Sequence, residues 1–120
     1  KMGPDFIQLS GEDGTALEFN SLGGVGCISV SANVAPKLCS EFQEASTAKN
    51  NSNLLAKAKE INEKLTPLHK SLFIESSPSP VKYAASILNL CSEEVRLPLV
   101  KVTDETKKAV KSAMIYANLL

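Results

Sequence analysis

The spacing of hydrophobic residues changes from strand-like to helix-like along the chain. Two short apolar runs come first, at residues 6–9 and 25–30, and the second is rich in β-branched side chains. Such runs predict buried strands, because a strand covered on both faces needs no polar alternation. Residues 15–22 have the spacing of a short helix, and the Gly-Gly pair at 23–24 predicts its end. Strand, helix and strand in this order predict a βαβ unit with two parallel strands.

From residue 36 onward the apolar residues recur three and four positions apart, which is typical of amphipathic helices. The predicted helices span residues 36–48, 54–73, 81–89 and 103–117. Pro36 suits the first turn of a helix, where its missing N–H costs nothing, and Thr103 is a hydroxyl cap. Pro67 lies inside the longest helix, which it should kink or divide. Residues 91–98 predict an irregular segment, and residues 96–100 predict extended backbone.

The two apolar runs need more sheet than this sequence provides. Two parallel strands leave their faces and outer edges uncovered, and strands this apolar predict further strands on each side. The sequence opens on Lys1-Met2 and enters the first apolar run with no lead-in. We therefore expect it to start inside a longer protein, whose upstream chain completes the sheet.

Composition is that of an ordinary globular protein. The 120 residues suffice for one domain with a core, and 43% hydrophobic with 22% charged residues is typical. Thirteen basic residues balance thirteen acidic ones, which argues against a nucleic-acid partner. No apolar stretch reaches the roughly 20 residues that cross a membrane, and no signal-peptide pattern opens the chain. The three cysteines have apolar neighbours, which predicts buried free thiols and a cytoplasmic location.

The residues themselves present no complete catalytic set. His69 is the only histidine, and a structural or surface role is favoured because no nucleophile accompanies it in a motif. One histidine and three scattered cysteines give no metal-ligand spacing, so neither a metal nor another cofactor is expected. Glu12 and Asp13 precede a predicted helix and are interpreted as its N-terminal cap. The glycines at 23–26 precede a strand, unlike those of a dinucleotide motif, and no lysine ends a predicted strand.

Five ordered sequence blocks resemble the dihydrodipicolinate synthase family. They are Leu-Ser-Gly-Glu-Asp at residues 9–13, Leu-Gly-Gly-Val-Gly-Cys-Ile-Ser-Val-Ser-Ala-Asn-Val-Ala-Pro at 22–36, Leu-Thr-Pro-Leu-His-Lys-Ser-Leu-Phe at 65–73, Pro-Ser-Pro-Val-Lys-Tyr-Ala at 78–84 and Arg-Leu-Pro-Leu at 96–99. The resemblance covers nearly the whole chain and is to the carboxyl-terminal part of that enzyme. It implies an α/β fold, with the last two βα units of a (β/α)8 TIM barrel (strands seven and eight) in residues 1–49. Residues 50–120 would form a three-helix C-terminal domain.

The resemblance also implies an activity for the whole protein. Enzymes of this family are class I lyases that condense pyruvate with L-aspartate semialdehyde to 4-hydroxy-tetrahydrodipicolinate, in the diaminopimelate route to lysine. Pyruvate is held as a Schiff base on a lysine, which would lie upstream of Lys1 with the family's proton-relay residues. The isolated chain is therefore expected to be inactive without the N-terminal part of the barrel. The family commonly forms homotetramers, as dimers of dimers.

Two substrate-binding residues carry over by their place in the matching blocks. Ile28 matches the strand-eight residue that lines the pyruvate site, and Gly11 matches a glycine that leaves room for substrate after strand seven. Without the resemblance, Ile28 is interpreted as a core strand residue and Gly11 as a loop glycine. Pyruvate-dependent aldolases of the N-acetylneuraminate lyase or keto-sugar-acid type are an alternative, although they usually lack the block at 26–34. A non-catalytic structural module is the alternative from a different class.

Overall fold

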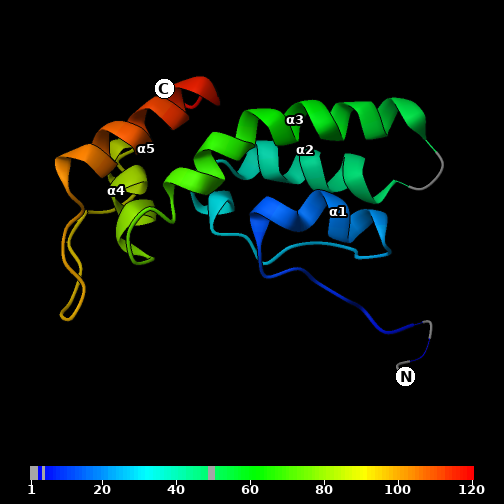
Figure 1. Ribbon diagram of the computed structural model, residues 1–120, viewed down its shortest axis with the longest axis horizontal. Helices are drawn as coiled ribbons and strands as arrows, with labels where there is room; N and C mark the ends of the chain where they lie inside the picture. Colours follow the sequence, from blue (N-terminus) through cyan, green and yellow to red (C-terminus); the bar gives the residue numbers. More distant parts are fainter. Residues whose placement is uncertain (1–2, 4, 49–50) are drawn as a thin grey trace.

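Helices make up most of the molecule, and an extended segment leads into them from the N-terminal side (Figure 1). The computed structural model describes residues 3, 5–48 and 51–120. Its elements are the 3-10 helices η1 (Asp13–Thr15) and η2 (Ser31–Asn33), and the α-helices α1 (Ala16–Ser21), α2 (Pro36–Thr47), α3 (Ser52–Ser71), α4 (Ser79–Ile87) and α5 (Asp104–Tyr116). Helix α1 packs against α2, α2 against α3, α3 against α5, and α4 against α5. The chain thus forms a row of helices, with α4 and α5 at one end (Figure 1).

The two apolar runs pair in parallel, as the predicted βαβ unit requires. A parallel bridge joins Ser10 to Cys27. The Ser10 N–H donates to the Gly26 carbonyl over 2.9 Å, and the Ser10 carbonyl accepts the Ile28 N–H over 2.8 Å. Among the described residues this bridge is the only β pairing, so neither run forms a complete strand.

The burial predicted for the two runs does not occur within this chain. The side chains of Ile7 and Ile28 are 70% and 72% exposed, and those of Phe6, Leu9 and Val25 are about half exposed. The prediction was wrong here because no further strand in the described part of the chain covers them. A parallel sheet is buried by its neighbours, not by its own two strands.

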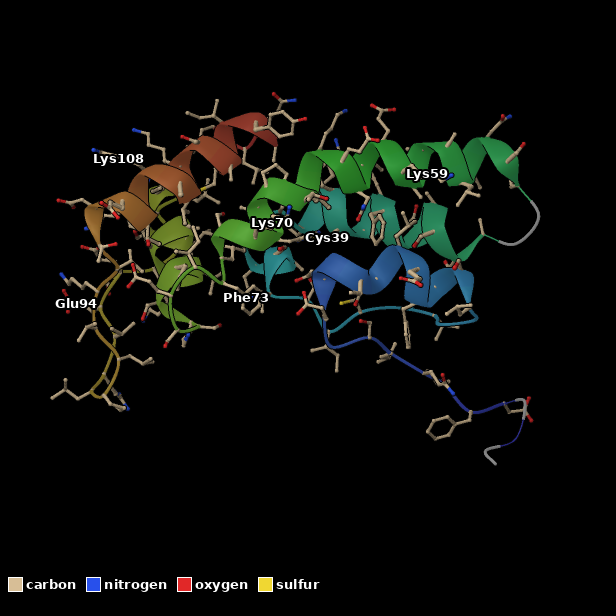
Figure 2. All side chains as sticks on the ribbon, viewed as in Figure 1. Cys39, Lys59, Lys70, Phe73, Glu94 and Lys108 are labelled. Atoms are coloured by element: carbon tan, nitrogen blue, oxygen red, sulfur yellow. The ribbon has the colours of Figure 1, made fainter. Side chains whose placement is uncertain are left out.

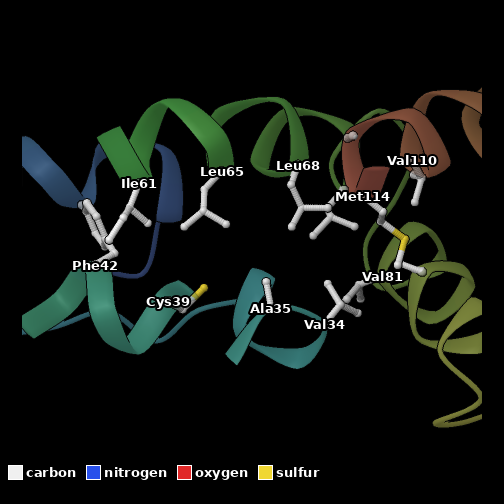
Figure 3. Close-up of a cluster of buried hydrophobic side chains, with 14 of the residues drawn as sticks. Val34, Ala35, Cys39, Phe42, Ile61, Leu65, Leu68, Val81, Val110 and Met114 are labelled. Carbon is white, nitrogen blue, oxygen red and sulfur yellow. The ribbon is translucent and has the colours of Figure 1, made fainter. Parts of the chain in front are cut away.

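The hydrophobic core lies along α3, between α2 and α5. Leu65 and Leu68 of α3, and Leu72 directly after it, are at most 1% exposed, and Val110 and Met114 of α5 are fully buried. Figure 3 shows Leu65, Leu68 and Met114 pointing into this shared interior. Leu65, Leu68 and Leu72 are three and four residues apart, which places them on one face of α3 and its C-terminal cap, and this face is buried.

Charged residues lie on the outer faces of the same helices. Lys59 of α3 and Lys108 of α5 are exposed, and Figure 2 shows Lys108 on the outer side of α5. None of the helices in residues 5–48 and 51–120 is both long and apolar enough to cross a membrane.

The predicted helices agree with the structure to within two residues at each end. Pro36 begins α2, and the Thr103 hydroxyl caps α5 by accepting the Thr106 N–H over 3.4 Å. Helix α3 runs through Pro67 without dividing, and it bends over its last turns in Figure 1, as a proline inside a helix explains. After α1, Gly23 has a φ of 108°, a backbone conformation that favours glycine.

Two local predictions were wrong, and one lies outside the described residues. Residues 96–100 are not extended, because the Leu99 N–H donates to the Arg96 carbonyl over 3.0 Å and closes a turn. Cys91 is exposed, whereas Cys39 is buried and Cys27 is half-buried, and all three are free thiols. The predicted boundary at residues 49–50 lies outside the described residues.

Candidate functional site

The two residues predicted to bind substrate lie next to each other, at the carboxyl ends of the paired runs. Gly11 follows Ser10 and Ile28 follows Cys27, the two residues that form the parallel bridge. A Cβ atom built on Gly11 would meet no heavy atom within 4 Å, and the Ile28 side chain is 72% exposed. The carboxyl ends of parallel strands are where barrel and open α/β proteins place their sites. Both residues therefore face open space at the expected edge.

Asp13 ties the loops that follow the two runs to each other. Its side chain is buried, and its Oδ2 accepts the N–H groups of Val30 and Ser31 over 2.9 and 3.1 Å. The Cys27 thiol also lies 3.8 Å from Oδ1 of this carboxylate. Glu12 behaves as predicted, since its Oε1 accepts the Gly14 N–H over 3.0 Å and caps η1. Asp13 instead binds the neighbouring loop, which its place before a helix did not indicate.

His69 of α3 continues this network into the helical part of the chain. Its Nδ1 lies 2.7 Å from the Ser31 hydroxyl, and both side chains are buried. Burial lowers the pKa of His69, although the carboxylates of Asp13 and Glu12 act in the opposite direction. The neutral imidazole is therefore favoured, and it shares a single hydrogen bond with the hydroxyl. The structural role predicted for His69 agrees with this position.

The cysteines near this edge are poor nucleophiles. Burial, followed by the charge of Asp13, raises the pKa of Cys27 to about 11. Burial also raises the pKa of Cys39 to about 11. Both thiols therefore stay protonated near neutral pH. Only the thiolate form of cysteine acts as a nucleophile or binds metal.

The described residues supply no nucleophilic amine or metal cluster at this edge. Lys37 is the one lysine in residues 5–48, and it lies exposed on the first turn of α2. No group of three or more His, Cys, Asp or Glu side chains is placed to hold a metal ion in the part of the chain that the structure describes. The arrangement can line and position a pocket, and it contributes no activated nucleophile of its own.

Comparison with known proteins decides the family. The family model described as "Dihydrodipicolinate synthetase family" matches residues 1–117. This chain belongs to that family. The predicted resemblance is confirmed, and it extends over nearly every residue.

Relatives in the dihydrodipicolinate synthetase family are longer than this chain. It is 63% identical over 120 residues to the 4-hydroxy-tetrahydrodipicolinate synthase of Pelagibacter ubique (strain HTCC1062), covering all of this chain and 41% of the relative. It is 58% identical over 118 residues to the enzyme of that name from Ruegeria pomeroyi, covering 98% and 39%. The chain therefore spans about 40% of the length of these relatives.

Solved dihydrodipicolinate synthase structures share the fold of this chain. The enzyme from Aquifex aeolicus matches with a TM-score of 0.89 at 36% identity, over 98% of this chain and 39% of that one. The chloride-inhibited enzyme from Acinetobacter baumannii, complexed with pyruvate, matches with a TM-score of 0.87 at 37% identity, over 96% and 38%. The chain thus has the fold of the C-terminal part of these TIM-barrel enzymes.

Sequence reasoning missed the contact between Ser31 and His69. These residues are 38 positions apart, and no local pattern joins them. A signal was nevertheless present, because His69 lies beside Leu68 on the stripe of α3 that faces the interior. A polar residue on a buried stripe requires a buried partner, and a hydroxyl is a suitable one.

Proposed function

We propose that residues 1–49 form the last two βα units of a TIM barrel, and residues 50–120 its C-terminal helical domain. The whole protein would be a 4-hydroxy-tetrahydrodipicolinate synthase, condensing pyruvate with L-aspartate semialdehyde in lysine biosynthesis. The observation that carries this proposal is the parallel bridge between Ser10 and Cys27, which places Gly11 and Ile28 at the carboxyl ends of two parallel segments. In a TIM barrel the carboxyl ends of the strands form the active-site face, and the chain belongs to a family whose relatives bear that name.

In the proposed mechanism this chain supplies one wall of the pyruvate pocket. The amine of an upstream lysine attacks the keto carbon of pyruvate and releases water, which leaves a Schiff base. Loss of a methyl proton gives an enamine, whose carbon attacks the semialdehyde. Ile28 provides an apolar surface beside the pyruvate methyl group, and Gly11 leaves room for the second substrate. Without the upstream lysine, this chain alone is inactive.

The exposed apolar faces of the two runs support a barrel that is completed by upstream chain. Ile7 and Ile28 are more than two-thirds exposed, and Phe6, Leu9 and Val25 are about half exposed. Covering such surface is favourable by about 25 cal/mol per Å² of apolar area. Strands added on either side would bury it, and the completed protein is expected to assemble as a cytoplasmic homotetramer.

Turnover measurements on two proteins test this proposal. The protein with its upstream chain and the 120-residue chain alone are each given pyruvate with L-aspartate semialdehyde. We expect turnover only from the longer protein, with Ile28→Ala raising its KM for pyruvate and the exposed Leu97→Ala leaving it unchanged. Turnover by the shorter chain would contradict the proposal that the Schiff-base lysine lies upstream of it.

The choice of aldehyde separates the alternatives. Turnover of the longer protein with a sugar-derived aldehyde, and none with L-aspartate semialdehyde, would replace the proposal with an aldolase of the neuraminate or keto-sugar-acid type. If the longer protein turns over no aldehyde, the alternative of a non-catalytic structural module would be supported.

A further inference from the structure

A buried series of hydrogen bonds connects α3 to the loop that follows Ile28. It runs from the His69 imidazole to the Ser31 hydroxyl, 2.7 Å away, and the Ser31 N–H donates to Asp13 over 3.1 Å. All three side chains are at most 7% exposed. Buried hydrogen-bonded groups hold their geometry, because breaking one bond leaves a polar partner buried without a hydrogen bond.

The backbone around Ile28 is held on both sides, and Asp13 supplies the hold on the second side. On the N-terminal side of Ile28, the parallel bridge between Ser10 and Cys27 links the paired runs. The Ile28 N–H also donates to the Ser10 carbonyl over 2.8 Å. Two residues after it, the Val30 N–H donates to Asp13 over 2.9 Å. The backbone at Ile28 therefore spans two fixed points, and the second point depends on the turn that Ser31 begins.

Local hydrogen bonds restrain the turn at residues 29–33, in addition to its contact with α3. The Ser29 hydroxyl accepts the Ala32 N–H over 2.9 Å, and the Asn33 side chain donates to the Val30 carbonyl over 3.0 Å. These bonds are local and fix the shape of the turn. The Ser31–His69 bond is different, because it is a side-chain hydrogen bond that joins this turn to α3, 38 residues further along the chain.

We infer that His69 is a positioning residue for the substrate pocket, acting through Ser31 on the turn at 29–33 and on Ile28. The helical part of the chain thereby sets the place of a pocket wall, without touching substrate. The link to the pocket rests on the proposed function, whereas the control of the turn by His69 does not.

Variants of the protein with its upstream chain test this inference. His69→Leu keeps the volume and removes the hydrogen bond, whereas His69→Asn keeps a polar group near the place of Nδ1. Ser31→Ala removes the other partner. Ser71→Ala is the matched control, because the Ser71 hydroxyl is buried on the same helix and donates only to the Leu68 carbonyl.

Three readouts distinguish positioning from a structural role: KM and kcat for pyruvate, hydrogen exchange of residues 28–34, and the unfolding midpoint. We expect His69→Leu to raise KM about tenfold, as loss of about 1.4 kcal/mol implies, and to speed exchange in 28–34. His69→Asn should restore most of both, and Ser31→Ala combined with His69→Leu should be no worse than either alone. Ser71→Ala should lower the midpoint without changing KM or exchange.

The inference is overturned if His69→Leu lowers the unfolding midpoint like Ser71→Ala but leaves KM and exchange unchanged. Additive effects of Ser31→Ala and His69→Leu would also overturn it, because the two residues would then act separately. If the unaltered protein shows no turnover of pyruvate, the proposed function fails. Hydrogen exchange then decides alone: faster exchange of 28–34 in His69→Leu supports control of the turn, and unchanged exchange refutes it.

Discussion

Large apolar side chains are buried in one part of this chain and exposed in another. In the helical part, Leu68 and Leu72 are completely buried, whereas in the paired runs Ile7 and Ile28 are 70% and 72% exposed. A helix satisfies its backbone within itself and buries one face against another helix. A parallel strand needs neighbours for its outer hydrogen bonds and for both faces. The helices therefore close a core with the residues at hand, and the two runs leave an open edge.

The largest effect should come from the closed core. Leu68→Ala is expected to lower the free energy of unfolding of this chain by about 2–5 kcal/mol, because it removes buried methyl groups and leaves a cavity. Leu97→Ala is the matched control, since Leu97 is 87% exposed, and it should change stability by less than about 0.5 kcal/mol. Urea unfolding measures both. Equal effects would mean that the helical part has no closed core of its own.

The Ser31–His69 contact, which connects the paired runs to the helical part, should make stability depend on pH. This effect should be smaller than that of Leu68→Ala. Burial lowers the pKa of His69 below the ordinary 6.5. Between that lowered pKa and 6.5 the unfolded chain binds more protons than the folded one, so stability should fall as the pH drops through this window. His69→Asn should flatten this part of the curve of unfolding midpoint against pH.

If the unfolding midpoint of His69→Asn depends on pH with the same slope as that of the unaltered protein, the burial of a neutral imidazole at the Ser31–His69 contact would be contradicted.

In the 120-residue chain, the smallest effect is expected on the open edge. Ile7→Ala should change the stability of the 120-residue chain by less than about 0.5 kcal/mol, because its side chain already lies in water. In the protein with its upstream chain the same substitution should cost about 2–4 kcal/mol, because neighbouring strands would bury the side chain. Urea unfolding of both pairs gives the difference. Similar small losses in both proteins would contradict a completed sheet.

The sequence predicted those features that depend on local spacing. The helix bounds followed from apolar residues three and four positions apart, and the cap at Thr103 from a hydroxyl before two acidic residues. Parallel pairing of the two runs followed from their order around a helix.

Features that depend on distant partners were beyond local patterns. The burial expected for the two runs failed because it requires strands that are not among the described residues. The bond between Ser31 and His69 was missed because periodicity tells which face of α3 is buried, not which residue meets it. Exposure of Cys91 was missed because its apolar neighbours in sequence lie on an exposed loop.

Borohydride trapping tests the central claim most directly. The protein with its upstream chain is treated with pyruvate and borohydride, which reduces a Schiff base to a stable secondary amine, and its peptides are mapped by mass spectrometry. The account predicts one pyruvate adduct on a lysine upstream of residue 1 and none within the 120 residues. The 120-residue chain alone should gain no adduct. A longer protein that is never labelled, or an adduct on a lysine of this chain, would contradict it.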